Sequence, residues 1–321
     1  MNQKAFIPIV IILIFAAIAS VPFILNQSKN TQVLPNLEST PSPTIEASPS
    51  ATPIATPIAT ASAKPTPNAT IKPTPLPTKT PEPVVTNNIP PGAGFSSQNV
   101  SLDGQSFKVS LVAADLNSTR VIIDTASDSD CAKDCPTLSL GDYVGRNGAW
   151  AGINGSYFCP ADYASCTDKK NSFDTLLMNK NKYYFNSANN VYSTVPAAIF
   201  SAGFSRFVSQ SSEWGRDTGV DAVIANYPLL IRANNINFTE NPNEPKFGGK
   251  AARTFISVKG STVYIGIVYG ASMGDSAKVL HALGMDEALN LDQGGSTALW
   301  YGGYKAGPGR GIPNAILFIN R

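Results

Sequence analysis

The stretch "TFISVKGSTVYIGIVYG", residues 254–270, decides the fold class of this chain. Two runs rich in Val, Ile, Phe and Tyr flank the short segment Lys259–Ser261. β-branched and aromatic residues favour strands, and a glycine-containing turn between two such runs is typical of a β-hairpin. The stretch therefore predicts two antiparallel strands joined at residues 259–261.

Further strand-like runs lie on both sides of this hairpin, separated by Gly, Asn and Pro. They are "SFKVSLVAADL" (106–116), "RVIIDTA" (120–126), "VDAVIANYPLLI" (220–231) and "AILFI" (315–319). We expect an α+β fold in one globular domain, residues 95–321: a mostly β, mixed-sheet core with a few helices packed on one side.

Two helices are predicted within this domain. The first covers 139–148, with Ser139 as its cap and Gly148 as its stop. The second covers 274–285, capped by Asp275 or Ser276 and ended by Gly284.

The N-terminal segment 6–25, "FIPIVIILIFAAIASVPFIL", is uncharged and apolar. It is long enough to span a bilayer as a helix. We interpret residues 1–25 as a retained membrane anchor. The alternative is a signal peptide cleaved near Ala17–Ala19. The first interpretation predicts a membrane-anchored protein with an extracytoplasmic C-terminal domain, and the second predicts a secreted one.

Residues 26–94 are rich in Pro, Thr, Ser and Ala and include the repeat "ATPIATPIAT". Proline excludes a regular helix or β-ladder, and the scarcity of large apolar residues leaves too little to bury. We expect a disordered, semi-rigid linker that gives the domain reach from the membrane.

Charge and residue counts exclude several kinds of function. The net charge of +2 comes without a basic cluster, so no nucleic-acid partner is expected. The single histidine, His281, lies in the second predicted helix and weighs against a histidine-rich metal site or a Ser-His-Asp triad. We assign it no chemistry, so acid/base work would fall mainly to carboxylates.

The chain has four cysteines, and its N-terminal segment implies export, which favours disulfides over a zinc site. Of the three possible pairings, we favour the two local ones, Cys131–Cys135 and Cys159–Cys166. Each would stiffen a polar loop.

One candidate site is "ALNLDQGGSTALWYGG", residues 288–303, where an apolar run ends at Asp292. Glycines allow close approach of a ligand to the backbone, and consecutive N–H groups can form an anion-binding nest. A hairpin turn between two strands explains the pattern equally well. The residues after Asp292 are Gln293, Gly294, Gly295, Ser296 and Thr297.

A second stretch is "AWAGINGSYFCPADYASC", residues 149–166. Its Asn154-Gly155 pair is a hairpin signal. Tyr157 and Phe158 follow, next to the predicted disulfide loop, and such a stiff aromatic segment would suit the wall of a sugar site.

Two further motifs are Arg253-Thr254, which opens a strand, and Arg310, which precedes the last strand. A guanidinium group binds phosphate through two parallel hydrogen bonds. For either arginine taken alone, a solvated surface position is the simpler interpretation.

Taken together and in order, the four motifs resemble the phosphodiester glycosidase family over residues 105–320. That family's pattern is an Asn-Gly-aromatic motif, an Arg-Thr pair, "NLDGGGS" and Arg-x-x-x-Asn. Here it reads Asn154-Gly155-Ser156-Tyr157-Phe158, Arg253-Thr254, Asn290-Leu291-Asp292-Gln293-Gly294-Gly295-Ser296 and Arg310-Gly311-Ile312-Pro313-Asn314. Two residues depart from it: Gln293 replaces the first glycine of the triplet, and Ser156 replaces a glycine common after Asn-Gly.

The resemblance implies hydrolysis of a sugar-1-phosphodiester, similar to an N-acetylglucosamine-1-phosphodiester, in envelope or exopolysaccharide glycans. It implies that Asp292 is a general acid/base or nucleophile, and that Arg253 acts beside it on the phosphate. The implied substrate- and phosphate-binding residues are Asn154, Gly155, Thr254, Gly294, Gly295, Ser296, Thr297 and Arg310.

Glycoside cleavage usually uses two carboxylates. The candidates for the second are Glu213 and Asp217, with Asp221 in the same polar stretch, "SSEWGRDTGVD". A phosphate leaving group needs little protonation, so one carboxylate would also suffice.

Two alternatives stay open at this point. A non-catalytic carbohydrate- or wall-binding module on the same fold would explain Gln293 and the missing second carboxylate. The motifs specify no cofactor. Asp292 would either provide a carboxylate ligand for Ca²⁺ or hold its own loop by hydrogen bonds to the loop amides. The expected partners are a glycan or sugar phosphate and, through the N-terminal helix, a membrane; the sequence does not specify an oligomeric state.

Overall fold

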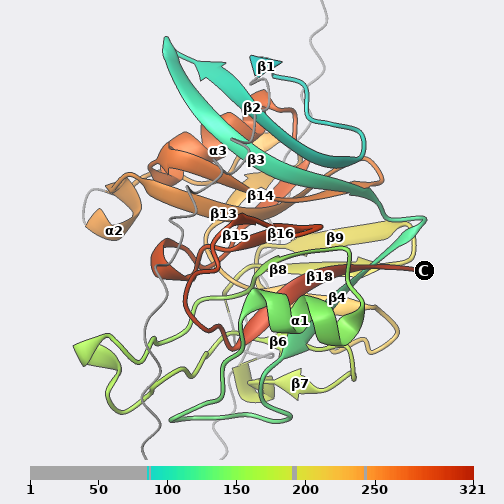
Figure 1. Cartoon of the computed structure of the whole chain (residues 1–321), viewed down its shortest axis with the longest axis vertical. Helices are drawn as coiled ribbons and strands as arrows, with labels where there is room; N and C mark the ends of the chain where they lie inside the picture. The colour runs from blue at the N-terminus through green and yellow to red at the C-terminus, as the bar shows by residue number, and fades with distance from the viewer. Residues whose placement is uncertain (1–84, 87, 190–193, 242–243) are drawn as a thin grey trace, which may run out of the picture. The chain divides into compact units, whose positions relative to one another are not determined.

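The computed structural model of the chain describes residues 85–86, 88–189, 194–241 and 244–321 (Figure 1). The predicted anchor, residues 1–25, and residues 26–84 of the predicted linker lie outside the described residues. Among the described helices, none combines the length and apolar character that crossing a bilayer requires. Strand β1 (Val85–Thr86) falls within the predicted linker and pairs in parallel with β2, so the sheet begins before residue 95.

The largest sheet has eight strands and contains the predicted hairpin. In spatial order these are β1, β2 (Gly94–Leu102), β3 (Gln105–Asp115), β14 (Thr262–Ala271), β13 (Ala251–Lys259), β15 (Glu287–Asn290), β11 (Leu229–Arg232) and β12 (Asn235–Ile236). Strands β13 and β14 pair antiparallel up to Lys259 opposite Thr262, which confirms the turn predicted from the sequence.

Two five-stranded sheets complete the fold. The β18 sheet has the order β17 (Tyr304–Ala306), β16 (Leu299–Tyr301), β5 (Ala151–Asn154), β18 (Asn314–Asn320) and β4 (Thr119–Thr125). The β8 sheet has the order β7 (Tyr184–Phe185), β6 (Leu177–Met178), β10 (Ala222–Ala225), β8 (Ala197–Ser201) and β9 (Phe204–Val208).

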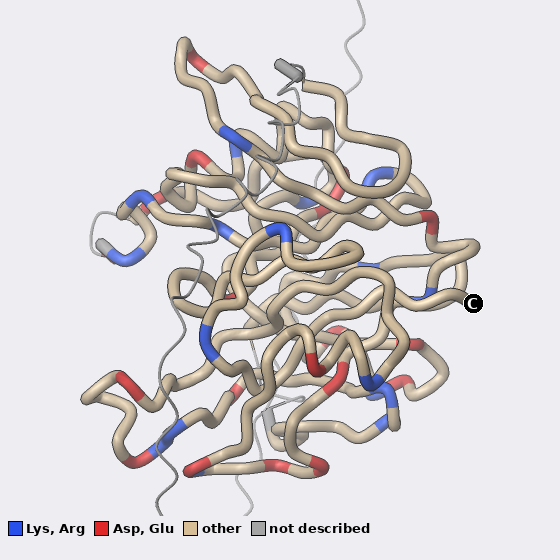
Figure 2. The backbone as a smooth tube through the Cα atoms, viewed as in Figure 1, with Lys and Arg blue, Asp and Glu red and all other residues tan. Residues whose placement is uncertain are grey.

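One hydrophobic core joins the three sheets. Alternate residues of β14, namely Val263, Ile265 and Ile267, point into it, as the two-residue period of a strand requires. Ile316 of the β18 sheet and Ile224 of the β8 sheet belong to the same cluster. The charged residues lie mainly in loops and at strand ends (Figure 2). Because all three sheets contribute to the same core, the described residues form one domain.

The helices cover two different sheets. Helix α3 (Met273–Ala282) packs on the outer face of the eight-stranded sheet, and α1 (Leu140–Asn147) packs on the β18 sheet (Figure 1). The expectation of helices on one side is therefore wrong, because each of these sheets has an apolar outer face of its own to bury. The short helix α2 (Pro245–Gly248) lies before β13.

The capping of α1 agrees with the sequence, whereas that of α3 does not. Ser139 caps α1 and Gly148 ends it in a left-handed conformation. Helix α3 is capped by Ser272 and not by the predicted Asp275 or Ser276. Asp275 is instead the capping-box partner of Ser272. His281 lies on α3 and is exposed.

One predicted strand run is split between two sheets. Of "VDAVIANYPLLI", the first half forms β10 in the β8 sheet and the second half forms β11 in the eight-stranded sheet.

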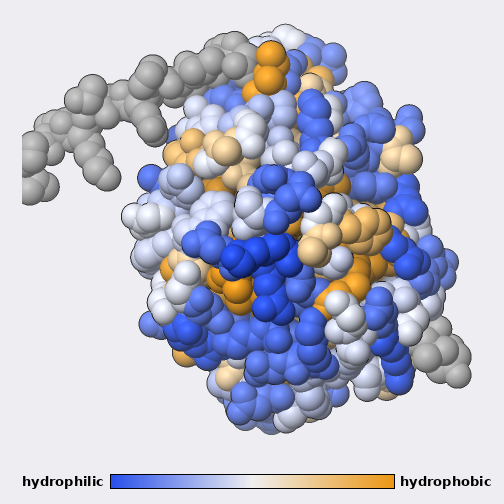
Figure 3. All heavy atoms as spheres, turned by 90° about the vertical axis from the view of Figure 1, so that its right-hand side faces the viewer, coloured by the Kyte–Doolittle hydropathy of each residue, from blue (hydrophilic) through white to orange (hydrophobic). Residues whose placement is uncertain are grey.

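The face shown in Figure 3 is mainly hydrophilic, with hydrophobic patches that are separated from one another.

Candidate active site

The Asp292 loop, residues 291–298, connects two sheets. It starts after β15 in the eight-stranded sheet, passes through a 3₁₀ turn, η4 (Gly294–Ser296), and ends before β16 in the β18 sheet. The hairpin interpretation of this stretch is therefore wrong. Asn154-Gly155 is not a hairpin either, since β5 pairs with β16 and β18, which come much later in the chain.

Two fully buried side chains hold this loop by its backbone. Asn154 Nδ2 donates to the Asp292 carbonyl at 2.7 Å, and the Ala298 N–H donates to Asn154 Oδ1 at 3.1 Å. Thr254 Oγ1 donates to the same Asp292 carbonyl. With their polar atoms directed to the loop, Asn154 and Thr254 hold Asp292 in position, and neither is among the residues that line the cavity at Asp292.

Gly155 and Ser156 lock this end of β5 to Asn314. The Gly155 N–H donates to the Asn314 carbonyl at 3.1 Å, and the Gly155 carbonyl accepts from the Asp292 N–H at 2.9 Å. The Ser156 N–H donates to Asn314 Oδ1 at 2.9 Å, and Asn314 Nδ2 donates to Ser156 Oγ at 3.1 Å. The departure at Ser156 thus supplies a hydroxyl that satisfies the buried Asn314 amide.

A cavity of about 430 Å³ opens in front of this framework. It is lined by two arginines, two lysines, one carboxylate and several aromatic and small residues: Tyr157, Phe158, Pro160, Tyr163, Lys246, Gly249, Lys250, Ala251, Arg253, Asp292, Gln293, Gly294, Ser296 and Arg310. Four positive side chains around a single carboxylate give this cavity a net positive charge, which attracts anions and repels cations.

Asp292 is the buried carboxylate of this cavity, with 8% of its surface exposed. Burial raises its pKa to about 6, although hydrogen bonds from the Ser296 side chain and the Gln293 backbone, and the charge of Arg310, act in the opposite direction. Its Oδ2 atom has no hydrogen-bond partner among the described residues. A carboxyl group that titrates near neutral pH is suited to proton transfer.

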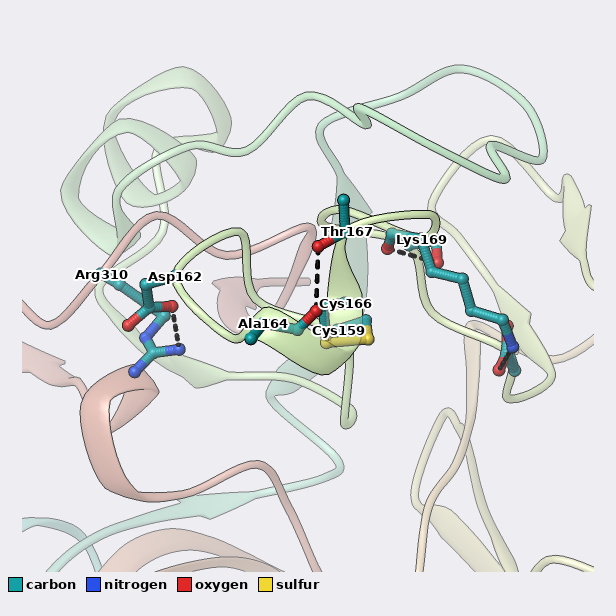
Figure 4. Close-up of a disulfide and its surroundings, with 9 residues drawn as sticks. Cys159, Asp162, Ala164, Cys166, Thr167, Lys169 and Arg310 are labelled. Atoms are coloured by element: carbon teal, nitrogen blue, oxygen red, sulfur yellow. Dashed lines mark hydrogen bonds and ion pairs between the residues drawn. A yellow bond between two sulfur atoms is a disulfide. The ribbon is translucent and has the colours of Figure 1, made fainter.

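Arg310 is held at the cavity by the predicted disulfide loop. Its Nη1 lies 2.9 Å from Asp162 Oδ1 (Figure 4). Its guanidinium lies 5.1 Å from the centre of the Tyr163 ring. Asp162 and Tyr163 both belong to the loop closed by the disulfide Cys159–Cys166. The structure contains this disulfide, so the predicted pairing is confirmed. The disulfide Cys131–Cys135 is confirmed as well.

Arg253 is 1% exposed and is held by neutral acceptors. Its Nε donates to the Ala271 carbonyl at 3.0 Å, and its Nη2 donates to the carbonyls of Phe247, at 3.3 Å, and Gly249. Its Nη1 donates to Oε1 of Gln293. Burial lowers the pKa of the guanidinium, as expected for a cation without an ion-pair partner among the described residues.

The structure does not bring the expected second carboxylate to the cavity. Glu213 accepts from the Gln210 N–H at 3.0 Å, and Asp217 accepts from the Gly219 N–H at 2.7 Å. Asp221 pairs with Arg120 at 2.9 Å and with Arg321 at 2.7 Å. All three lie near the β8 sheet, because 3₁₀ turn η3 (Ser211–Glu213) follows β9 there.

The residues at Asp292 do not fit a calcium ion. Among the described residues, no three His, Cys, Asp or Glu side chains gather as metal ligands. The neighbours of Asp292 across the cavity are arginines and lysines, which repel a cation, whereas Ca²⁺ takes six to eight oxygen ligands.

Of the five side chains expected to share one site, the cavity includes Arg253, Asp292, Ser296 and Arg310, while Asn154 lies behind the loop. Gly294 also lines it, whereas Gly155, Gly295 and Thr297 are not among its lining residues. Sequence reasoning missed Lys246 and Lys250. The only local signal for them was a lysine pair flanking the glycines before Arg253.

A second, smaller cavity of about 220 Å³ shares the Tyr157 and Phe158 wall. Phe173 and Tyr227 add two more aromatic rings to its lining. Lys169 and Asp174 also line it and form an ion pair with each other at 3.7 Å. The cationic cavity therefore has a neighbour with a largely aromatic wall.

The substitution Gly295→Ala tests whether Arg310 binds phosphate. A Cβ at residue 295 would lie 2.2 Å from Arg310 Nη2, so Gly295→Ala is expected to displace the guanidinium while leaving the fold intact, because a flexible side-chain end can move. Losing a charge-assisted hydrogen bond should weaken inorganic phosphate binding about tenfold in calorimetry. Arg310→Ala should give the same loss, and the double variant should add nothing; additive losses would contradict this explanation.

The fold and the cavity define a mostly β protein with two disulfides and a cationic cavity that contains one carboxylate. The chain belongs to the phosphodiester glycosidase family, whose model matches residues 147–319, more than half of the chain. A search of curated proteins finds no match.

Several solved structures resemble this fold, and two of them match it with a TM-score of 0.54. One is the catalytic domain of zebrafish N-acetylglucosamine-1-phosphodiester alpha-N-acetylglucosaminidase, auto-inhibited by its pro-peptide, with a TM-score of 0.54 and 15% identity over 75% of this chain and 87% of that one. The other is a hypothetical protein from Synechocystis, with a TM-score of 0.54 and 15% identity over 71% of this chain. The match spans 62% of the Synechocystis protein.

Proposed function

We propose that this protein hydrolyses a sugar-1-phosphodiester, releasing the sugar and a phosphomonoester. The observation that carries the proposal is Asp292, a carboxylate with a pKa raised to about 6, in a cavity with two arginines and two lysines. Family membership supports the reaction class, and the zebrafish enzyme's name suggests N-acetylglucosamine as the sugar.

In the proposed reaction Arg310, Lys246 and Lys250 bind the phosphate oxygens. Ionised Asp292 takes a proton from water as the water oxygen bonds to C1 of the sugar. The bond between C1 and the phosphate oxygen breaks, and its electron pair stays on the phosphate, whose charge the cations stabilise. One carboxylate suffices, because a phosphate leaving group needs no proton from a second acid.

We place this reaction outside the cytoplasm. Two disulfides are typical of proteins that fold in an oxidising compartment, and the predicted N-terminal anchor would hold the domain at the membrane. The proposed substrates are phosphodiester-linked glycans of the cell envelope or exopolysaccharide.

The pH dependence of hydrolysis tests the state in which Asp292 acts. A general base and a nucleophile both require the ionised carboxylate, so kcat/KM is expected to fall about tenfold per pH unit below the pKa of about 6 and to level off above it. A general acid would give the opposite profile. Initial rates across this range, with the full chain in detergent, decide between the two.

The experiment for the proposed function is direct. The full chain is incubated with N-acetylglucosamine-1-phosphodiesters, and released sugar and phosphomonoester are quantified.

The second candidate function is that of a carbohydrate-binding module, which the single carboxylate in the cavity favours. It predicts binding of the substrate without release of sugar.

A further inference from the structure

Gln293 covers the buried guanidinium of Arg253 on the cavity side. A guanidinium has five N–H donors: one on Nε and two on each Nη. Nε and Nη2 are directed to main-chain carbonyls, and Nη1 donates to Gln293 Oε1. Only one Nη1 N–H is left for any ligand, so Arg253 cannot offer phosphate a two-donor fork while Gln293 holds this position.

The orientation of the Gln293 amide follows from chemistry. Arginine has no acceptor, so only the carbonyl oxygen of Gln293 can face it, and Nε2 must point away. Gln293 lines the cavity, and no described residue accepts a hydrogen bond from its Nε2. The cavity wall therefore presents a neutral N–H₂ group in front of a buried cation.

We infer that Gln293 is a specificity-determining residue that reserves this part of the cavity for a neutral oxygen of the substrate. The ligand group is a hydroxyl or amide carbonyl oxygen of the sugar, which the Gln293 amide would bind. The phosphate is thereby confined to the side lined by Arg310, Lys246 and Lys250. This assignment of a sugar oxygen rests on the proposed function.

Removing the amide should convert the site into a stronger anion site. Gln293 has an extended backbone, with φ −143°, that alanine adopts without strain. Gln293→Ala frees Arg253 Nη1, and hydrogen bonds to charged groups are the stronger kind. We expect inorganic phosphate to bind about tenfold more tightly by calorimetry at a pH above the Asp292 pKa, since ~1.4 kcal/mol is tenfold.

Gln293→Glu is the matched control, because it keeps the shape and adds a negative charge beside Arg253. It should weaken phosphate binding relative to the wild type. Both variants should keep the thermal unfolding temperature near that of the wild type. Unchanged or weaker phosphate binding by a folded Gln293→Ala variant would overturn the inference.

The sugar side has its own measurement. Gln293→Ala should weaken binding of the neutral sugar N-acetylglucosamine about tenfold in calorimetry, because it loses the amide hydrogen bond. The free sugar carries no phosphate, so the gain at Arg253 does not offset this loss. Unchanged binding of the sugar would overturn the assignment of a sugar oxygen. The phosphate titrations need no turnover, so they test the masking of Arg253 even where the hydrolysis assay contradicts the proposed function.

Discussion

Replacing Asp292 by Asn is expected to lower kcat by about 10²–10⁴-fold, the range typical of losing a general base. The side-chain shape is kept, and the loop is held mainly by the Asp292 backbone, through Asn154, Thr254 and Gly155. The defect should therefore be in the chemical step, with inorganic phosphate still bound. Sugar release and phosphate calorimetry on the same preparation measure the two quantities.

The same variant should be more stable than the wild type at alkaline pH. Because burial raises the pKa of Asp292 from 3.8 to about 6, the folded state favours the protonated form, and the ionised form costs about 3 kcal/mol of stability. That cost is absent below the unfolded pKa, grows as pH rises and is complete above about 6. Asn carries no charge, so its advantage should appear in denaturant unfolding at pH values above 6 and vanish below about 4.

These two measurements separate a catalytic Asp292 from a structural one. A buried residue that served only to hold its loop would lose stability when changed to Asn, and activity would fall with it. Full activity in a folded Asp292→Asn variant would remove Asp292 from the reaction and favour the binding module.

Gly155→Ala is expected to destabilise the fold by about 3 kcal/mol or more, the upper part of the range for overpacking. A Cβ there would lie 1.8 Å from Asn314 Oδ1 and 2.9 Å from the Asn314 carbonyl oxygen. Strands β5 and β18 would have to separate at this point, and Asp292, whose N–H donates to the Gly155 carbonyl, would move with them. Denaturant unfolding and sugar release should both show the effect.

Gly145→Ala is the matched control for this substitution. Gly145 is exposed on α1, no atom lies within 4 Å of a Cβ placed there, and alanine favours helix by up to about 1 kcal/mol. It should leave stability unchanged or raise it slightly. Equal effects of the two substitutions would contradict the close packing of Gly155 against Asn314.

Much of the secondary structure was predictable, since it depends on local patterns. The β13–β14 hairpin follows from a glycine turn between β-branched runs, and α1 follows from Ser139 and Gly148. The cap of α3 was misplaced because Ser272, Asp275 and Ser276 are all good capping residues, and only the geometry selects Ser272.

The pairing of distant strands was beyond such patterns. The Asn154-Gly155 and Gly294-Gly295 turns both look like hairpins. Yet β5, which ends at Asn154, pairs with the distant strands β16 and β18, and the Gly294-Gly295 turn connects β15 and β16, which belong to different sheets. A local turn signal reports backbone conformation, and strand partners are decided by the packing of the whole core.

Local patterns in the sequence were enough to assign the fold class, to favour the two local disulfides and to group Asp292, Arg253 and Arg310 in one family motif set. The environments of these residues come from the tertiary structure. It buried Asp292 enough to raise its pKa, placed Asn154 and Thr254 behind the loop, and left Glu213 and Asp217 away from the cavity. The physical reason is that desolvation and hydrogen-bond partners depend on residues brought together from distant segments, which spacing along the chain does not specify.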